Sequence, residues 1–253
     1  MDTTKAITHI GLCAGYGGIE LGLKRVLPTL CTVALCEIEA FAVANLVAKM
    51  EAGLMDAAPI WTNLKTFPWA DFRDRVDILT SGYPCQPFSA AGKRLGADDP
   101  RHLWPSIAAG IAILRPRVCF FENVEGHITL GLSTVVSDLE EMGYKVSWGI
   151  FSAAECGAPH QRKRVFVFAY TNSNGVERYR NSKFIEKNRQ GRENCQALIN
   201  EEFADIDWKS ESARGLVGEN DGGSDWVDRV RLLGNGVVPA TAEKAFRTLI
   251  NQF

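Results

Sequence analysis

The chain has 253 residues, of which 46% are hydrophobic and 23% charged, and its formal net charge is -2. This length and composition allow one sizeable core with a small appended lobe, and they exclude a disordered or fibrous protein. Because the sequence shows neither an apolar run of about eighteen residues nor a signal-peptide pattern, we expect a cytoplasmic protein with no membrane association.

The cysteine spacing bears on metal binding and redox state, and the distribution of charge bears on nucleic-acid binding. The cysteines are odd in number and lack the close pairs of a zinc site, so we expect most of them to be reduced thiols and expect no metal. They are Cys13, Cys31, Cys36, Cys85, Cys119, Cys156 and Cys195.

The slightly negative net charge argues weakly against nucleic-acid binding, but basic residues gather at 162–164 and 178–192. Either a basic binding face or an ordinary solvated surface fits this pattern.

Short β-rich runs alternate along the chain with helical segments. The expected strands are Ile7–Cys13, Cys31–Cys36, Val76–Ser81, Val118–Glu122 and Arg164–Ala169. The expected helices, with apolar residues at three-to-four spacing, are Leu21–Val26, Ala40–Met50, His102–Leu114 and Thr134–Met142. This order predicts an α/β fold with a doubly wound, mostly parallel sheet.

The alternation stops near residue 171. Residues 171–225 are rich in Asn, Gly, Ser, Arg and Glu, and we interpret them as a small irregular lobe. Residues 1–170 and 226–253 would form the main domain, with a Gly-Asn-Gly turn and a closing helix over Ala240–Ile250.

The first two strands end in residues suited to a ligand. Cys13-Ala14-Gly15-Tyr16-Gly17-Gly18 lets the backbone approach a small adenosyl-type cofactor closely, although tight strand-to-helix packing is the alternative. The glycine order is not that of the dinucleotide fingerprint. Glu37, at the end of the second strand, is placed either to bind ribose hydroxyls or to stabilise the next helix N-terminus.

A candidate nucleophile follows the third strand. Cys85 stands between two prolines in Tyr83-Pro84-Cys85-Gln86-Pro87, a rigid loop at the carboxyl edge of the sheet. A structural cysteine lies more often within a strand or helix, so this position favours reactivity. Glu122 ends the next strand at the same edge, and thiol and carboxyl would converge there; a helix-capping carboxylate is the alternative.

A basic segment, Gln161-Arg162-Lys163-Arg164, enters the last predicted strand. Strand alternation puts Arg162 and Arg164 on one face, where two guanidinium groups would suit a phosphate or a base carbonyl, or simply a solvated edge. His160 is interpreted as a loop residue, because no second metal-binding side chain lies at ligand spacing.

In this order, the segments resemble the DNA cytosine-5 methyltransferase family over about two-thirds of the chain. The matching blocks are Ile10–Gly22, Pro84-Cys85-Gln86, Glu122-Asn123-Val124, Gln161–Arg164 and Leu233–Pro239. The resemblance implies a Rossmann-like fold that uses S-adenosylmethionine and methylates carbon 5 of cytosine. Cys85 would attack carbon 6, Glu122 would act at ring nitrogen 3 with a raised pKa, and Arg162 and Arg164 would hold the base carbonyl and phosphate.

The resemblance also implies a cofactor site. Its residues would be Cys13, Ala14, Gly15, Gly17, Gly18, Glu37, Ile38, Asn63, Pro84 and Asn235. Two positions depart from the family pattern, since Asn63 stands where Asp is usual and His160 where Gln is usual. The first departure puts a contact with the adenine amine in doubt.

The implied partner is double-stranded DNA, whose cytosine must be flipped out of the helix. The resemblance is to bacterial or phage enzymes, which implies a cytoplasmic, nucleoid-associated protein. A cognate restriction endonuclease would fit, and the choice between monomer and dimer stays open. The region available for target recognition, 171–225, is short.

Three alternatives share part of this pattern. An RNA-directed enzyme would use the same chemistry on tRNA, but its usual late Cys-Phe-Thr segment is missing from the sequence. A catalytically silent DNA-binding relative is disfavoured because Cys85, Glu122, Arg162 and Arg164 are all present. Thymidylate synthase also adds a thiol to a pyrimidine, but without a glycine-rich strand-to-helix turn.

Overall fold

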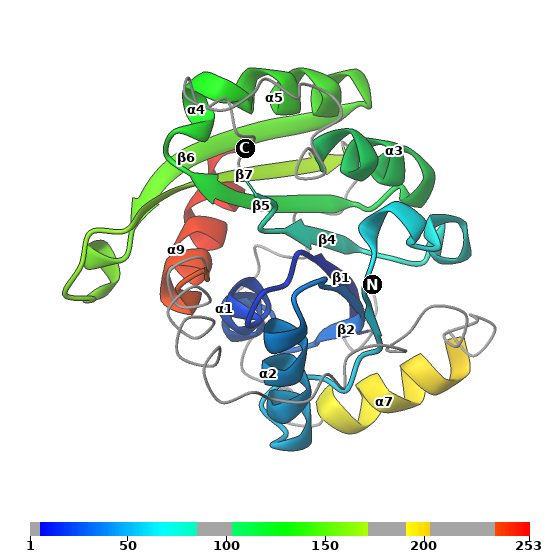
Figure 1. Ribbon diagram of the computed structural model, residues 1–253. Helices are drawn as coiled ribbons and strands as arrows, with labels where there is room; N and C mark the ends of the chain where they lie inside the picture. The colour runs from blue at the N-terminus through cyan, green and yellow to red at the C-terminus, as the bar shows by residue number, and fades with distance from the viewer. Residues whose placement is uncertain (1–5, 85–102, 172–190, 203–235) are drawn as a thin grey trace.

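The computed structural model describes residues 6–84, 103–171, 191–202 and 236–253 (Figure 1). These residues form a seven-stranded sheet of order β3-β2-β1-β4-β5-β7-β6. The strands are β1 (Ile7–Leu12), β2 (Leu30–Cys36), β3 (Ile60–Trp61), β4 (Ile78–Ser81), β5 (Val118–Val124), β6 (Tyr144–Ser152) and β7 (Lys163–Thr171). Only the β7 pairings are antiparallel. The predicted doubly wound, mostly parallel α/β sheet is confirmed.

Helices cover both faces of the sheet. They are α1 (Gly18–Val26), α2 (Ala40–Glu51), α3 (Trp104–Leu114), α4 (His127–Leu130), α5 (Leu132–Glu141), α7 (Gly191–Glu202) and α9 (Pro239–Leu249). Short 3-10 turns are η1 (Leu64–Thr66), η2 (Trp69–Phe72), η4 (Ala154–Cys156) and η6 (Ile250–Gln252). Within the described residues no helix is both long and apolar enough to cross a bilayer.

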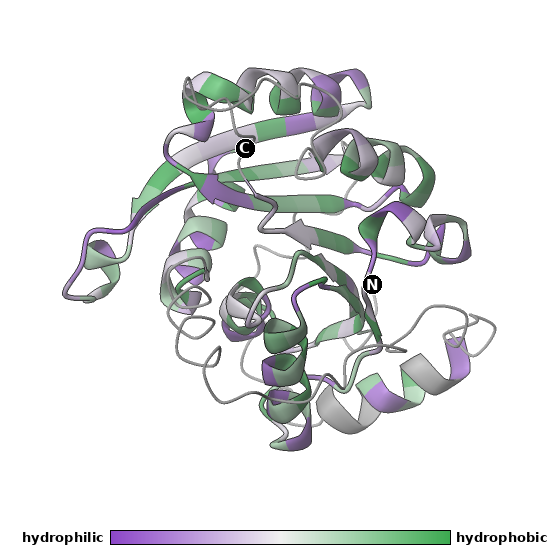
Figure 2. Ribbon diagram, viewed as in Figure 1, coloured by the Kyte–Doolittle hydropathy of each residue, from purple (hydrophilic) through white to green (hydrophobic). Residues whose placement is uncertain are grey.

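Strand β7 illustrates why the sheet is buried on both faces. Its side chains alternate, so that Val165 and Val167 join the cluster under α3 and α5, while Phe166 and Phe168 join the cluster under α1 and α9. Figure 2 shows the resulting hydrophobic colour along the central strands. Strands with both faces covered have near-continuous apolar sequences, which is why the sequence indicated them.

Among the helices and strands that the structure describes, β3, β6, α4 and α7 were not predicted. Strand β6 was not expected, because as an edge strand it mixes exposed apolar residues such as Trp148 and Ile150 with polar ones. Helix α7 lies inside the region 171–225 that we expected to be irregular. Its composition has little helical periodicity, and it contacts β2. The ends of the remaining elements coincide with the predicted ones or differ from them by at most three residues.

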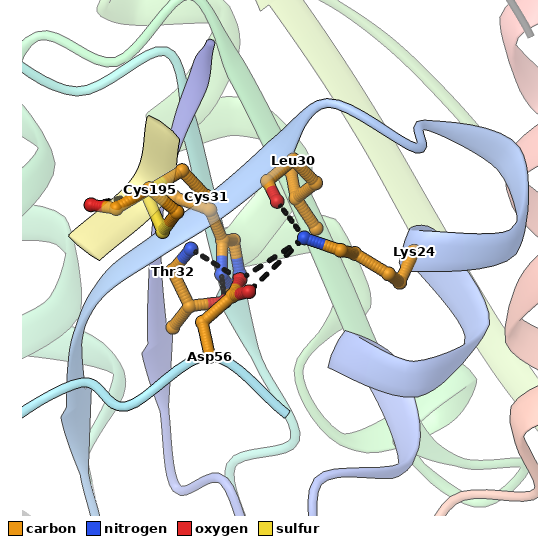
Figure 3. A network of polar contacts seen from close by, with 7 residues as sticks. Lys24, Leu30, Cys31, Thr32, Asp56 and Cys195 are labelled. Carbon is orange, nitrogen blue, oxygen red and sulfur yellow. Dashed lines mark hydrogen bonds and ion pairs between the residues drawn. A yellow bond between two sulfur atoms is a disulfide. The ribbon is translucent and has the colours of Figure 1, made fainter. Parts of the chain in front are cut away.

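A group of contacts fastens α1, α7 and the chain after α2 to β2 (Figure 3). Lys24 Nζ lies 3.1 Å from Asp56 Oδ1, and the Thr32 amide donates to Asp56 Oδ2 at 3.0 Å. Beside them, Cys31 of β2 and Cys195 of α7 form a disulfide across 164 positions of sequence. We expected most cysteines to be reduced thiols, and these two are the exceptions among the described ones. The packing of α7 on β2 brings them together, and no local spacing in the sequence indicates the pair. Four described cysteines, Cys13, Cys36, Cys119 and Cys156, are free thiols.

Candidate active site

The loop between β1 and α1 takes a shape that glycine permits. Gly15 and Gly17 have φ values of 55° and 82°, and Cys13 also has a positive φ of 49°. Gly18 is required for a different reason, since a Cβ atom there would lie 2.1 Å from the Val237 carbonyl oxygen. The loop can therefore pass close to the segment that precedes α9.

Glu37 lies next to this loop, at the carboxyl end of β2. Its side chain is buried and accepts hydrogen bonds from the Gly15 amide at 2.7 Å and the Glu39 amide at 2.8 Å. Burial raises the pKa of Glu37, and these amides oppose the rise. The following residue, Ile38, is 73% exposed. A fixed carboxylate with lone pairs to spare, beside an uncovered apolar side chain, fits the ribose and adenine of an adenosyl cofactor.

Cys13 belongs to the same loop, and the pKa of its thiol is raised. Burial raises its pKa to about 12, and the Glu37 carboxylate adds to the rise. Cys13 is thus a neutral thiol lining the site and no nucleophile. The adjacent Ala14 amide donates to the Cys36 carbonyl at 3.2 Å, which keeps the loop against the end of β2.

Glu122 is buried near the carboxyl end of β5. A Cβ atom on Gly82, just after β4, would lie 3.5 Å from Glu122 Oε2 and 3.7 Å from the Cys13 carbonyl oxygen. The acid, the cofactor loop and the start of the Pro84-Cys85 loop therefore meet at one edge of the sheet. Burial raises the pKa of Glu122 to about 7, although Arg164 and Arg162 oppose the rise.

The two arginines lie beside this carboxyl. Arg164 Nε is 2.9 Å from Glu122 Oε1, an ion pair without the alignment of a hydrogen bond. Arg162 donates from Nη2 to the Gly236 carbonyl, and burial followed by the charge of Arg164 lowers its pKa. The Arg162 Nε atom is buried with no hydrogen-bond partner among the described residues.

Tyr16 was not singled out by the sequence analysis, yet it joins the two ends of the site. Its hydroxyl donates to the Val237 carbonyl, and Lys49 Nζ lies 4.9 Å from the centre of its ring. A Cβ atom on Gly236 would overlap the Tyr16 ring. The segment before α9 is thereby held against the β1–α1 loop, and only tertiary structure could have indicated this contact.

The other predicted site residues differ in how far the structure describes them. Cys85 and Asn235 lie outside the described residues, and Pro84 is exposed at the end of a described segment. Asn63 follows β3, whose Trp61 carbonyl accepts from the Glu37 amide, and its own Oδ1 accepts from the Lys65 amide at 3.0 Å. The first contact brings the end of β3 beside Glu37.

His160 lies in an exposed loop, as expected.

Solved structures share this architecture. DNMT2 of Spodoptera frugiperda has a TM-score of 0.57 at 21% identity, covering 67% of this chain and 51% of that one. The Dnmt2 methyltransferase of S. pombe has a TM-score of 0.51 at 22% identity, covering 67% and 50%. The fold is therefore that of a Rossmann-like methyltransferase.

The sequence comparison is more specific. Residues 7–215 match the family described as C-5 cytosine-specific DNA methylase, and the chain belongs to this family. Type II methyltransferase M.NgoBV of Neisseria gonorrhoeae is 32% identical over 64% of this chain and 40% of its own length. M.NgoMIV of the same organism is 33% identical over 65% and 52%. The chain thus spans about half the length of these relatives or less.

Proposed function

We propose that the protein transfers a methyl group from S-adenosylmethionine to carbon 5 of cytosine in duplex DNA. The observation that carries the proposal is the buried Glu122, with a pKa raised to about 7, beside Arg164 and facing the start of the Cys85 loop. A carboxyl that can be neutral near pH 7 suits hydrogen bonding to a pyrimidine ring nitrogen. The family match and the names of the relatives support the same activity.

The chain's own residues would act in the following order. The Cys85 thiolate bonds to carbon 6 while Glu122 gives or shares a proton at nitrogen 3. This proton neutralises the negative charge that develops in the ring as the thiolate adds. Carbon 5 would then take the methyl group from the sulfonium as the methyl carbon–sulfur bond breaks and leaves a neutral thioether, and nitrogen 3 would return its proton to Glu122. A water molecule then removes the carbon 5 proton, the 5,6 double bond re-forms, and Cys85 leaves as thiolate. Arg162 and Arg164 would hold the base carbonyl and a phosphate.

S-adenosylmethionine would supply an electrophilic methyl group on a sulfonium. Glu37 would bind its ribose hydroxyls, and Ile38 would cover one side of its adenine. Cys13, Ala14, Gly15, Gly17 and Gly18 would line the methionine end, with Asn63, Pro84 and Asn235 completing the pocket. The fit of Glu37 and Ile38 rests on the amide contacts of the carboxylate and on the exposure of the neighbouring side chain.

We also propose the substrate, the compartment and the domain organisation of the protein. Double-stranded DNA with a flipped cytosine is the substrate, and the cytoplasm, at the nucleoid, is the compartment. Residues 171–225 would serve as a short target-recognition insert in a catalytic domain made of 1–170 and 226–253. A cognate restriction endonuclease is in keeping with relatives named type II methyltransferases.

The test uses the full chain. Purified protein with methyl-labelled S-adenosylmethionine should label duplex DNA, and Cys85→Ala should abolish labelling. Cys156→Ala, which removes a free thiol elsewhere, should retain it. Bisulfite sequencing of DNA from a methylation-free host expressing the protein would identify the target sequence. Labelling of tRNA and not of DNA would overturn the substrate, and full activity of Cys85→Ala would overturn the mechanism.

A further inference from the structure

Tyr83 lies where strand β4 (Ile78–Ser81) passes into the loop that carries Cys85. Its main chain is held, because Asn123 Nδ2 donates to the Tyr83 carbonyl at 3.0 Å. The next residue, Pro84, has a fixed φ, so the direction in which the chain leaves toward Cys85 depends strongly on how Tyr83 is held.

The side chain of Tyr83 is held as well. It is buried, and its hydroxyl is hydrogen-bonded to Nε2 of His127, the first residue of α4, at 3.0 Å. Its ring centre lies 5.8 Å from Trp104, 6.2 Å from Phe121 and 5.6 Å from His127, in tilted or edge-on arrangements. Three elements, α3, β5 and α4, therefore hold Tyr83 in place where the loop begins.

His127 is itself confined. It is 2% exposed, and its Cε1 atom lies 3.0 Å from where a Cβ on Gly131 would be. Its Nδ1 is buried with no hydrogen-bond partner in the described part of the chain. A charged imidazolium would need partners for both nitrogens, and burial lowers the pKa of His127 accordingly. The ring is thus a neutral partner for the Tyr83 hydroxyl.

From this arrangement we propose that Tyr83 and His127 act as a pair of positioning residues, which set the approach of the Pro84-Cys85 segment to Glu122. The proposal rests on the proposed function. Neither residue touches the reacting atoms. The Tyr83–His127 hydrogen bond connects α4, which follows the strand that carries Glu122, to the residue two positions before Cys85.

The experiment compares four variants of the full chain: Tyr83→Phe, His127→Leu, His127→Gln and the double variant Tyr83→Phe/His127→Leu. Single-turnover methyl transfer to duplex DNA should fall on the order of tenfold in Tyr83→Phe and His127→Leu, with KM for S-adenosylmethionine unchanged. His127→Gln, which keeps a polar group near Nε2, should recover most of the rate. The double variant should be no slower than the slower single variant, because both remove the same contact.

Tyr144→Phe is the matched control. Tyr144 is a buried tyrosine whose hydroxyl donates to the Pro116 carbonyl at 2.6 Å, at the other end of the sheet, so its loss should lower thermal stability and leave the rate unchanged. The pair would have no positioning role if Tyr83→Phe kept the wild-type rate, or if the losses in the single variants simply multiplied in the double variant.

Alkylation of Cys85 by iodoacetamide, located by peptide mass spectrometry, separates this inference from the proposed function. The alkylation rate should change several-fold in Tyr83→Phe and His127→Leu and stay at the wild-type value in Tyr144→Phe. If the wild-type protein methylated no cytosine, the proposed function would fail while this comparison still tested the pair. An unchanged alkylation rate in both variants would overturn the inference even in an active enzyme.

Discussion

Glu122 is subject to two opposing influences, burial that favours its neutral form and Arg164 that favours its charged form. With burial as the larger influence, its pKa rises to about 7, against an ordinary value near 4.5. A neutral carboxyl is therefore available near neutral pH, and it is lost as the pH rises above that value. A residue that must donate a proton to the ring should make the reaction depend on this titration.

We expect Glu122→Gln to slow methyl transfer on the order of 100-fold or more, because an amide can donate but cannot transfer its proton. In the wild type, single-turnover rates should fall as pH rises through about 7, and this titration should be missing from the variant. Rates measured from pH 5.5 to 9 check both expectations. Glu125→Gln, which alters an exposed carboxylate near Lys163, is the control and should leave the profile unchanged. A profile shared by wild type and Glu122→Gln would contradict the assignment.

Asn63 is one of the two positions that depart from the pattern implied by the family resemblance, and its amide oxygen already accepts a hydrogen bond from the Lys65 amide. A carboxylate could keep that capping bond and present a second acceptor to an adenine amine. We expect Asn63→Asp to tighten S-adenosylmethionine binding several-fold, about 1 kcal/mol, with an unchanged thermal midpoint. Isothermal titration calorimetry checks this, and unchanged or weaker binding would place the adenine amine elsewhere.

At these residues the sequence was informative about type and order but not about partners. Glu37 and Glu122 were predicted to lie at strand ends; Glu37 directly follows β2, and Glu122 lies two residues before the end of β5. The end of a strand can be predicted from the residues around it, because hydrophobic alternation and glycine turns are local signals. The contacts of Tyr16 with Val237 and of Tyr83 with His127 join residues far apart in the chain, and no local pattern encodes them.

Among the elements, α1 buries an unusual side chain against the sheet. Glu20 of α1 is 5% exposed, its Oε1 accepts from the Thr80 hydroxyl at 3.4 Å, and its Oε2 has no hydrogen-bond partner among the described residues. Thr80 also contacts His9 Nε2 at 2.9 Å. Burial raises the pKa of Glu20 to about 7.

Glu20→Gln should therefore stabilise the protein more at pH 8 than at pH 5. The folded protein binds the Glu20 proton more tightly than the unfolded chain does, so this group's stabilising contribution is complete below about pH 4.5 and is lost as pH rises through about 7. Glutamine keeps the neutral form at every pH, and the gain at pH 8 should reach roughly 3 kcal/mol at most. Thermal unfolding of both proteins at the two pH values measures it, with the exposed Glu51→Gln as control. An equal shift at both pH values would contradict the argument.

The two longest elements that the sequence did not predict, β6 and α7, share a physical cause. Among the described strands, β6 pairs with β7 alone, and exposed residues such as Trp148 break its alternation. Helix α7 contacts β2 through a face that includes Cys195 and a partly buried Leu198. Both elements depend on neighbours supplied by the rest of the fold, and tertiary context can outweigh weak local propensity.

At the scale of the whole molecule, two contacts fasten the later part of the chain to the sheet. The segment before α9 closes the site through Tyr16 and Arg162, and α7 is fastened to β2 by the Cys31–Cys195 disulfide. The first of these lies at the proposed active site. The second joins the proposed recognition insert to the catalytic sheet, so that the two should unfold together.

The disulfide should therefore contribute to global stability without contributing to chemistry. A cross-link spanning 164 positions restricts the unfolded chain, and such bonds typically contribute about 2–4 kcal/mol. Under oxidising conditions Cys195→Ser should lower the urea midpoint, and with dithiothreitol wild type and variant should unfold at nearly the same concentration. Methyl transfer at 25 °C should stay within about twofold of wild type, because neither cysteine lies near Glu122. If wild-type unfolding were indifferent to dithiothreitol, or peptide mapping found no Cys31–Cys195 link, α7 would be held on β2 by packing alone.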